Sequence, residues 1–542
     1  MHIRFSALQP SPAVAAALLS VLLLAGIAAG HEGHRVAQLA VLALPALLCL
    51  RFPLKSRCWR ICRLIVVSGT MGLFLVDGAV RAFLQAGYRA LPDSSLVLAA
   101  VANTTPREIA EYVSSQKNGL LVAGLALLLA WVAATWLAAT CNRHGAAVGR
   151  AGRWAMVLLA LVCLVGLASK PWRRHHPLLF WPAWVQSVQA LQHSWSDQRE
   201  QRGALLANAH SAAARITLAA PSTVVLVLTD SVNRDNMSLY GYPRDTTPEL
   251  QALRQSERDH LLVLRHAWSV EPSTVASLSG IFSFGARDQD DPVRDTHHLL
   301  ALARAAGYRV WWLSNHDDIA IDQQHARLAD FVAMNNREPG RSSSSLDGEL
   351  LDDLDAALQD KASHKLIVVH LLGAHPHYHL RIPEAMRPFP DAPDAVDAEM
   401  LSEQRPAWLR SMRRTYDRAI RYHDSVVAQT LRLARLHAPQ HGHAAWMFLS
   451  DHGQEVGHDI DHAGHSPGTM AGYRIPTLLW RHGKPFDHEL ARRPFRADWS
   501  GWVLADLMGL SWAGMDRSRN VLDPAYDWQA PQLAISMARY DH

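Results

Sequence analysis

The stretch VVLVLTDSVNRDNMSLYGYPRDTTPEL, from Val224 to Leu250, decides the fold of the larger part of this chain. It begins with an apolar run of strand length, reaches Asp230 and then becomes polar. A second stretch, FLSDHGQEVGHD from Phe448 to Asp459, repeats the pattern, with Asp451 and His452 directly after the apolar run. Buried strands that end on polar side chains are typical of an open α/β sheet, which binds ligands beyond the carboxyl ends of its strands.

Apolar runs of strand length alternate with helix-period segments through this part of the chain. The runs are Val224–Leu228, Arg309–Leu313, Leu366–His370, Ala445–Leu449 and Thr477–Trp480. The helical segments between them include Thr296–Ala306, Gly348–Leu358 and Met412–Leu436. Continuous apolar strands separated by helices favour a mainly parallel central sheet flanked by helices. The sequence therefore predicts an α/β domain over residues 223–542.

The first 169 residues have a different character, that of a helical membrane domain. Long apolar stretches predict a bundle of about five transmembrane helices, at Ala13–Ala29, Val36–Leu50, Leu64–Phe83, Gly119–Thr140 and Trp154–Ala168. A cleaved signal peptide explains the first stretch alone but not the four that follow. Basic residues concentrate in the loops 51–63 and 141–153, which should therefore stay in the cytoplasm. Five crossings then deliver the α/β domain to the other side of the membrane.

Residues 170–222 are expected to form an interfacial linker, with tryptophans at headgroup depth. A helix over Val185–Ala209 fits either the membrane surface or ordinary packing on the domain. The net charge of +4 over 542 residues gives no reason to expect nucleic acid as a partner. No cysteine follows Cys163, so a conventional core rather than disulfides must hold the α/β domain.

Residues of the types that bind metals follow four of the predicted strands. They are Asp230, Asn315 to Asp318, His375 with His377, and Asp451 with His452. A single aspartate at a strand end is more often a turn or helix-cap residue than a ligand. Four strand ends that behave alike favour a metal site at one edge of the sheet. Aspartates, a histidine and a hydroxyl suit zinc, with manganese as the second choice.

Three blocks of sequence carry a family resemblance. They are the segment Val224–Leu250 with its Tyr-Gly-Tyr-Pro string, the Ser-Asp-His-Gly string at 450–453, and His370 to His375. The α/β domain resembles the alkaline phosphatase/sulfatase superfamily, and the whole chain resembles the inner-membrane phosphoethanolamine transferases that modify lipopolysaccharide. The resemblance implies a bacterial inner-membrane protein whose catalytic domain lies in the periplasm.

The resemblance also implies the catalytic residues. Aligned on Phe282-Ser283, the family's nucleophile falls on Thr274, with Ser273 as the alternative if the register slips by one. Pro272 fits an early position of the helix that is expected to carry Thr274. Zinc, as one or two ions, is implied at Asp230, Thr274, Asp451 and His452. His375 and His465 are implied to stabilise phosphoryl oxygens, to protonate the leaving group or to bind a second zinc, with His462 as the second candidate for the late histidine.

The chain departs from the family pattern in two ways. The family usually has Glu where this chain has Asp230, a shorter side chain of the same charge. Members that act on lipid A commonly flank the nucleophile with a cysteine pair, whereas this chain has Glu271 and Gly280 in the corresponding region. The second departure argues against lipid A in particular as the acceptor.

The implied reaction takes phosphoethanolamine from phosphatidylethanolamine, through a phosphorylated threonine, to lipopolysaccharide or another envelope glycan. Tentative substrate contacts are Asn103, Thr104 and Glu108, in a loop that resembles the family's headgroup loop, and His316 after the second strand. For Thr105 and Glu108 a helix capping box is an equally good interpretation. We expect a monomer.

Other functions remain open from the sequence. A membrane-tethered phosphodiesterase or sulfatase would use the same metal site with water as acceptor, although no Cys/Ser-x-Pro-x-Arg string occurs at the nucleophile block. A phosphoglycerol transferase, or a module whose metal only supports the fold, are further alternatives.

Overall fold

The computed structural model describes residues 10–51, 54, 56–88, 90–143, 149–196, 198–287, 296–335, 345–390, 392–537 and 539–540. Lys55 and residues 144–148, in the two basic loops, lie outside these ranges. The chain divides into two compact units. The first comprises Met1–Ala102 and Ala110–Leu191, and the second comprises Asn103–Ile109 and Gln192–His542.

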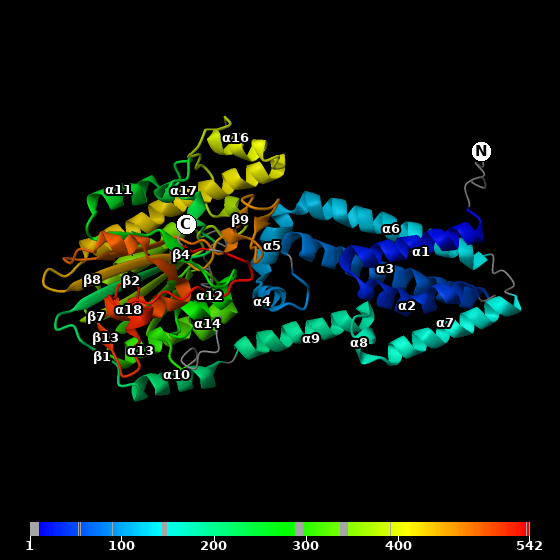
Figure 1. Cartoon of the computed structure of the whole chain (residues 1–542), viewed down its shortest axis with the longest axis horizontal. Helices are drawn as coiled ribbons and strands as arrows, with labels where there is room; N and C mark the ends of the chain where they lie inside the picture. The colour runs from blue at the N-terminus through cyan, green and yellow to red at the C-terminus, as the bar shows by residue number, and fades with distance from the viewer. Residues whose placement is uncertain are drawn as a thin grey trace. The chain divides into compact units, whose positions relative to one another are not determined.

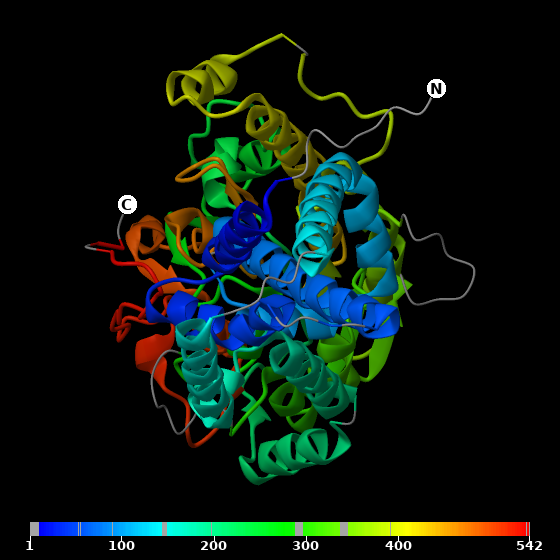
Figure 2. The same ribbon diagram turned by 90° about the vertical axis from the view of Figure 1, so that its right-hand side faces the viewer.

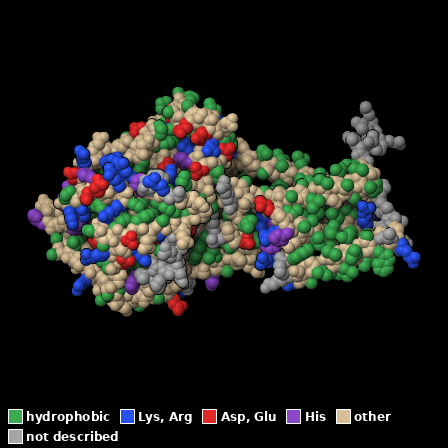
Figure 3. Space-filling model, viewed as in Figure 1, with side chains coloured by type: hydrophobic (Ala, Val, Ile, Leu, Met, Phe, Trp, Pro, Cys, Tyr) green, Lys and Arg blue, Asp and Glu red, His purple; other side chains and the backbone are tan. Residues whose placement is uncertain are grey.

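Helices make up the N-terminal part of the chain: α1 (Pro12–Gly30), α2 (His34–Leu48), α3 (Arg57–Tyr88), α4 (Ser95–Asn103), α5 (Pro106–Ser115), α6 (Lys117–Arg143), α7 (Arg150–Ala168), α8 (Lys170–Arg173) and α9 (Pro177–Ser196). Figure 2 views them end-on, with α1, α3 and α6 packed together and α2 against α7. Within the described residues, four helical segments are long and apolar enough to cross a membrane, Pro12–Gly30, His34–Arg51, Arg57–Tyr88 and Lys117–Cys141. The fifth predicted span corresponds to the shorter apolar segment Trp154–Ala168. Hydrophobic side chains cover much of the helical surface seen in Figure 3.

Close contact and one buried charge cluster hold the first unit together. A Cβ atom at Gly78 of α3 would lie 1.9 Å from the carbonyl oxygen of Gly26 in α1, so the two backbones touch. Asp77 contacts His31 at 2.9 Å, Arg81 at 3.0 Å and the Trp181 indole at 3.0 Å. A charged residue inside an apolar span is costly unless it faces protein or water, and Asp77 faces protein.

A seven-stranded sheet forms the centre of the second unit. Its order is β3-β11-β8-β2-β7-β5-β6, with β2 at Ser222–Thr229, β3 at Leu261–Leu264, β5 at Arg309–Ser314, β6 at Phe331–Met334, β7 at His364–Leu371, β8 at His443–Ser450 and β11 at Thr477–Arg481. All five predicted strands are present, and β3 and β6 are additional short ones. Only β11 runs against the others among these seven, so the prediction of a mainly parallel sheet is confirmed.

Helices cover both faces of this sheet (Figure 1). In β2, Val224, Leu226 and Leu228 join one hydrophobic core, and Val225 and Val227 join the other. This follows from the alternation of side chains along a strand and explains why the run is apolar throughout. The first core includes α12 (Thr274–Ile281), α13 (Leu299–Ala305) and α18 (Ser500–Leu507), and the second includes α11 (Pro248–Ser256), α15 (Leu350–Gln359) and α17 (Ala407–Leu436).

Two local predictions are wrong. The single helix expected over Val185–Ala209 is two helices, α9 and α10 (Arg199–Ser211). Pro272 is not an early helical residue, because α12 begins at Thr274 with Ser273 as its N-cap.

The remaining α-helices and strands of this unit are short. They are α14 (Ile319–Gln324), α16 (Ala395–Ser402) and six strands of two or three residues: β1 (Arg215–Ile216), β4 (His266–Trp268), β9 (Glu455–Val456), β10 (Ala463–Gly464), β12 (Pro494–Arg496) and β13 (Leu510–Ser511).

Candidate active site

Two neighbouring parallel strands bring Asp230 and Asp451 together at the carboxyl edge of the sheet. Strands β2 and β8 are paired up to Thr229 and Ser450, so the next residue of each strand is an aspartate at the same level. The Ser231 backbone N–H donates to Asp451 Oδ1 at 3.1 Å and the Ser231 hydroxyl donates to Asp230 Oδ1 at 2.5 Å. Both carboxylates are buried.

Thr274 meets this pair from the other side. It is the first residue of α12, and its hydroxyl donates to Asp230 Oδ2 at 3.0 Å. The same Oγ1 lies 3.4 Å from His452 Nε2. These contacts belong to Thr274, whereas the adjacent Ser273 makes no side-chain capping bond to the helix. The geometry therefore favours Thr274 over Ser273 as the reactive hydroxyl.

The four predicted metal ligands lie around one point. His452 Nε2 is 3.9 Å from Asp230 Oδ1 and 3.7 Å from Asp451 Oδ2. His452 Nδ1 is 2.8 Å from the carbonyl oxygen of Gly453, which fixes Nδ1 as the protonated nitrogen and leaves Nε2 free to bind a metal. The structure thus brings Asp230, Thr274, Asp451 and His452 together as the sequence predicts.

A divalent cation fits this donor set. Asp451 Oδ2 is buried and has no hydrogen-bond donor among the described residues. A buried carboxylate oxygen without a partner is costly, and a metal ion is one way to satisfy it. Burial, together with repulsion from Asp230, raises the pKa of Asp451 to about 6. Two adjacent buried carboxylates, a free imidazole nitrogen and a hydroxyl form a set of oxygen and nitrogen ligands that suits zinc.

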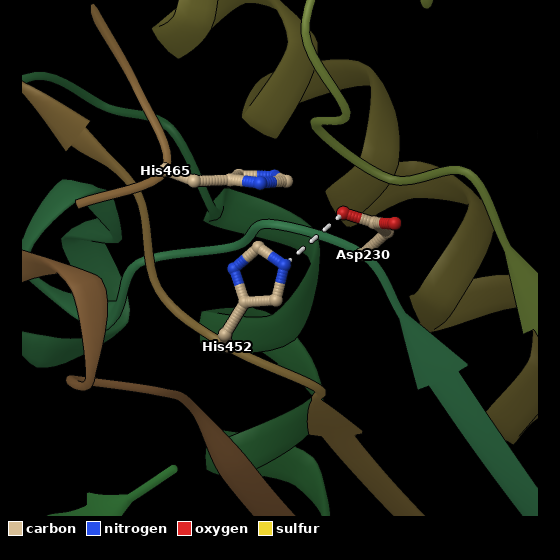
Figure 4. Close-up of side chains that lie close together, drawn as sticks. All are labelled: Asp230, His452 and His465. Carbon is tan, nitrogen blue, oxygen red and sulfur yellow. Dashed lines mark ion pairs between the residues drawn. The ribbon is translucent and has the colours of Figure 1, made fainter. Parts of the chain in front are cut away.

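His465 belongs to the same cluster. Ligand atoms of Asp230, His452 and His465 all lie within 4.8 Å of one another, and Figure 4 shows the three side chains pointing into one space. His465 reaches this edge because it directly follows β10, which pairs antiparallel with β9, a few residues after His452. His462 instead places Nε2 3.2 Å from the carbonyl oxygen of His465, so the geometry favours His465 as the late histidine.

His375 enters from the turn after β7. The Ala374 N–H donates to the carbonyl oxygen of Asp230 at 3.0 Å, and the His375 ring centroid lies 6.4 Å from that of His465. Burial lowers the pKa of both histidines well below the usual value, with further lowering at His375 by Arg381 and at His465 by His452. Both imidazoles are therefore neutral at pH 7, which suits metal binding or an N–H donated to phosphoryl oxygens better than carrying a proton.

The tentative substrate residues gather beside His375. Glu108 Oε1 lies 3.7 Å from His375 Nε2. The other oxygen, Oε2, accepts the Thr105 N–H at 2.8 Å, and the Glu108 N–H donates to Thr105 Oγ1 at 3.3 Å, so the capping box is also present. Asn103 Nδ2 donates to Asp318 Oδ1 at 2.6 Å, and Thr104 is exposed.

His316 is charged in this environment. Burial opposes its protonation, but the hydrogen bond and charge of Asp318 raise the pKa of His316 to about 9. Its Nδ1 is 3.1 Å from Asp318 Oδ2 and its Nε2 is 3.1 Å from the carbonyl oxygen of Leu371, so both nitrogens face acceptors. At Glu108, burial and then repulsion from Asp318 raise the pKa to about 7. The carboxyl groups of Glu108 and Asp318 therefore lie next to the imidazoles of His375 and His316, respectively.

Two residues that position the site are absent from the predictions. Ser231 adopts a φ of +63°, which is uncommon for a residue other than glycine. Asp347 accepts the N–H groups of Leu372 and Gly373 at 2.9 and 2.8 Å, and so anchors the turn that carries His375. No local pattern reveals either residue, because their partners are distant in the sequence.

Comparison with known proteins agrees with this geometry. The sulfatase family model matches residues 222–491. Phosphoethanolamine transferase EptC of Escherichia coli K12 is 31% identical over 325 residues, which cover 56% of this chain and 54% of that protein. The chain therefore matches about half the length of this curated relative.

Solved structures extend the comparison. The C-terminal periplasmic domain of E. coli EptC, crystallised with Zn, matches with a TM-score of 0.50 and 29% identity, covering 58% of this chain and 90% of that domain. The integral membrane lipooligosaccharide phosphoethanolamine transferase A from Neisseria meningitidis matches with a TM-score of 0.58 at 19% identity, over 94% of this chain and 98% of that one. The second match confirms the predicted two-part fold, an N-terminal helical part followed by an α/β domain.

Proposed function

We propose that this chain, whose residues 222–491 match the sulfatase family model, is a zinc-dependent transferase that moves phosphoethanolamine from phosphatidylethanolamine to an envelope glycan. One observation carries the proposal: the hydroxyl of Thr274 lies 3.0 Å from Asp230 and 3.4 Å from His452, beside a buried carboxylate oxygen of Asp451 that has no donor among the described residues. A site that only supported the fold would have no need for a hydroxyl at this position.

Asp230, Thr274, Asp451 and His452 would hold the zinc, with His465 as a further ligand or a donor to phosphoryl oxygens. The similar EptC domain was solved with Zn, and the donor types here are those that zinc prefers. Bound zinc lowers the pKa of a coordinated hydroxyl and offsets negative charge on the phosphoryl group.

The reaction proceeds in two displacements at phosphorus. The Thr274 oxygen forms a bond to the phosphorus of the lipid phosphodiester as its proton passes to Asp230 Oδ2, and the bond from phosphorus to the diacylglycerol oxygen breaks. That oxygen takes a proton from water and leaves as diacylglycerol. A hydroxyl or phosphate oxygen of the acceptor then attacks phosphorus and gives up any proton it carries to solvent, while the bond from phosphorus to the Thr274 oxygen breaks and that oxygen takes its proton back from Asp230. His375 and His465, both neutral, would donate N–H bonds to the phosphoryl oxygens.

Glu108 supports the choice of an ethanolamine headgroup. Its carboxylate lies 3.7 Å from His375, so a phosphate held by the histidines would leave an attached ammonium within reach of Glu108. A carboxylate at this position favours an ammonium over the neutral headgroup of a phosphoglycerol donor, whereas Asp318 is already paired with His316. Asn103 orients Asp318, and Thr104 and His316 remain predicted contacts.

A lipid donor explains the membrane part. The proposed location is the bacterial inner membrane, with the active site on the periplasmic side, lipopolysaccharide or another envelope glycan as acceptor, and a monomer as the working form. This topology needs α7 to cross. Its apolar segment Trp154–Ala168 spans about 22 Å at ~1.5 Å per residue, and the whole helix of 19 residues spans about 28 Å, against a hydrocarbon core of ~30 Å.

Intact-mass spectrometry tests the proposal. Purified protein incubated with phosphatidylethanolamine in detergent should gain the mass of phosphoethanolamine, and peptide mapping should locate it on Thr274. Thr274→Ala should abolish the adduct, while the matched variant Ser273→Ala should keep it. Release of free phosphoethanolamine without any glycan product would instead indicate a hydrolase, and an unmodified protein at saturating donor would refute the threonine intermediate.

A further inference from the structure

Two buried serines link the helix that carries Thr274 to the segment that carries Asp451. Ser269 lies just after β4 and is 1% exposed, and Ser277 lies in α12 and is 5% exposed. Ser269 Oγ is 2.6 Å from the carbonyl oxygen of Asp451 and 3.1 Å from Ser277 Oγ. Ser277 Oγ is 2.9 Å from the carbonyl oxygen of Glu271. We call Ser269, Ser277 and the Glu271 carbonyl the serine clasp.

The protons of the clasp can be assigned. Each hydroxyl has one proton and donates one bond. Ser269 Oγ has two carbonyl acceptors within reach, that of Asp451 at 2.6 Å and that of Glu271 at 2.7 Å. With the Ser269 proton on the shorter contact, to Asp451, Ser277 can donate to Ser269 Oγ and so connect α12 to the Asp451 carbonyl. The Glu271 N–H, 3.4 Å from Ser269 Oγ, supplies a weak bond to an otherwise free lone pair. Every donor of the clasp is used in this arrangement.

The Ser269 bond acts on the peptide between two proposed zinc ligands. The carbonyl of Asp451 belongs to the peptide that joins it to His452, and the Ser269 N–H is itself fixed to the carbonyl oxygen of Tyr473 at 2.8 Å. Ser277 stands three residues after Thr274, on the same short helix. The clasp therefore couples the position of the Thr274 hydroxyl to that of its ligand neighbours.

The other end of α12 is held separately. A Cβ atom at Gly280 would lie 3.0 Å from both Arg287 Cγ and Asp498 Cβ, so the helix packs tightly there. The five cysteines of the chain all precede residue 164, so no disulfide within residues 164–542 can fix the start of α12. Core packing of Leu278 and Ile281 and the hydrogen bonds of Thr274 and of the clasp hold the helix instead.

We propose that Ser269 is a positioning residue, which sets the distance between the Thr274 oxygen and the ligand pair Asp451–His452. The proposal rests on the proposed transferase function. It predicts a loss in the chemical step rather than in donor binding or zinc binding, because Ser269 touches neither the donor nor the ligand side chains. Misplacement of reacting groups by about 1 Å can lower a rate on the order of a hundredfold.

The test compares three single variants of the full chain in detergent: Ser269→Ala, Ser277→Ala and, as the matched control, Ser279→Ala. Ser279 lies in the same helix and bonds only within it, to the carbonyl oxygen of Val275 at 2.9 Å. For each variant, kcat and KM for phosphatidylethanolamine, the rate of adduct formation on Thr274, zinc content and Tm are measured.

We expect Ser269→Ala to lower kcat and the adduct rate by about ten- to a hundredfold, with KM and zinc content close to those of the wild type. Ser277→Ala should have a smaller effect and Ser279→Ala none. A wild-type rate in Ser269→Ala overturns the proposal, and so does a loss explained entirely by lost zinc or a collapsed Tm. If the wild type itself forms no adduct, the proposed transferase function is refuted, and the clasp proposal with it. If the wild type forms the adduct and Ser269→Ala forms it at the same rate, only the clasp proposal is refuted.

Discussion

Gly373 offers a sharp test of how the fold constrains the active site. It lies in the turn between β7 and His375 and has a φ of +56°. A Cβ atom at this position would lie 2.1 Å from Thr229 Oγ1 and 2.6 Å from the carbonyl oxygen of Asp230. Gly373→Ala should therefore both strain the backbone and push the turn away from the end of β2.

The cost has two parts, and a matched control separates them. A left-handed conformation costs a residue other than glycine about 1–2 kcal/mol, and overpacking a buried site costs about 1–3 kcal/mol more. Gly483 has a φ of +71° and open space around its Cβ position. Gly483→Ala should lose only the first part, about 1–2 kcal/mol, whereas Gly373→Ala should lose about 2–5 kcal/mol in total.

Thermal unfolding of the full chain, followed by tryptophan fluorescence, measures the difference. Tm should fall in the order wild type, Gly483→Ala, Gly373→Ala. Activity should fall only in Gly373→Ala, because the following N–H, that of Ala374, bonds to the carbonyl oxygen of Asp230. Equal Tm shifts in the two variants, or full activity in Gly373→Ala, would refute the view that packing against β2 sets the position of His375.

Three further perturbations address the site directly. Asp451→Asn should lower zinc affinity by at least the ~10–100-fold that loss of an outer-shell partner costs, and metal analysis after dialysis that found unchanged zinc would argue against ligation. Glu108, whose pKa burial and Asp318 raise to about 7, is uncharged below that pH and ionised above it. The KM for phosphatidylethanolamine should therefore rise as pH falls through about 7, whereas Glu108→Gln should give a high KM that does not follow this titration; parallel pH profiles would contradict the ammonium contact. Asp347→Asn, which replaces one of the two carboxylate oxygens that accept the Leu372 and Gly373 N–H groups with an NH2 donor, should cost about 1–3 kcal/mol and lower Tm by a few degrees. An unchanged Tm would show that this anchor of the turn is dispensable.

Much of the fold could be predicted from local sequence. The five strands were recognisable because strands buried on both faces are apolar without interruption, as β2 is. The membrane helices were recognisable because a hydrocarbon core requires long apolar stretches. The meeting of Asp230 and Asp451 followed from topology alone, since the carboxyl ends of parallel strands share one edge of a sheet.

The identities of the other site residues depended on resemblance, and the structure places Thr274 and His465 beside Asp230. Thr274 and His465 are far from Asp230 in sequence, and no periodicity in their own segments shows that they approach it. His465 arrives through the antiparallel pairing of β10 with β9, two short strands that the sequence did not indicate. The helix start at Thr274 rather than near Pro272 was also not visible from local preferences, because tertiary contacts position so short a helix.

The sequence by itself thus determined the two-part architecture, the layered α/β domain and the edge at which polar ligands collect, because these depend on hydrophobic patterning over neighbouring residues. Only the tertiary structure decided the positive φ of Ser231, the close packing around Gly373 and the serine clasp between Ser269 and the Asp451 carbonyl. These features depend on hydrogen bonds and steric contacts between segments as much as 182 residues apart, and such pairs leave no mark on the local composition of either segment.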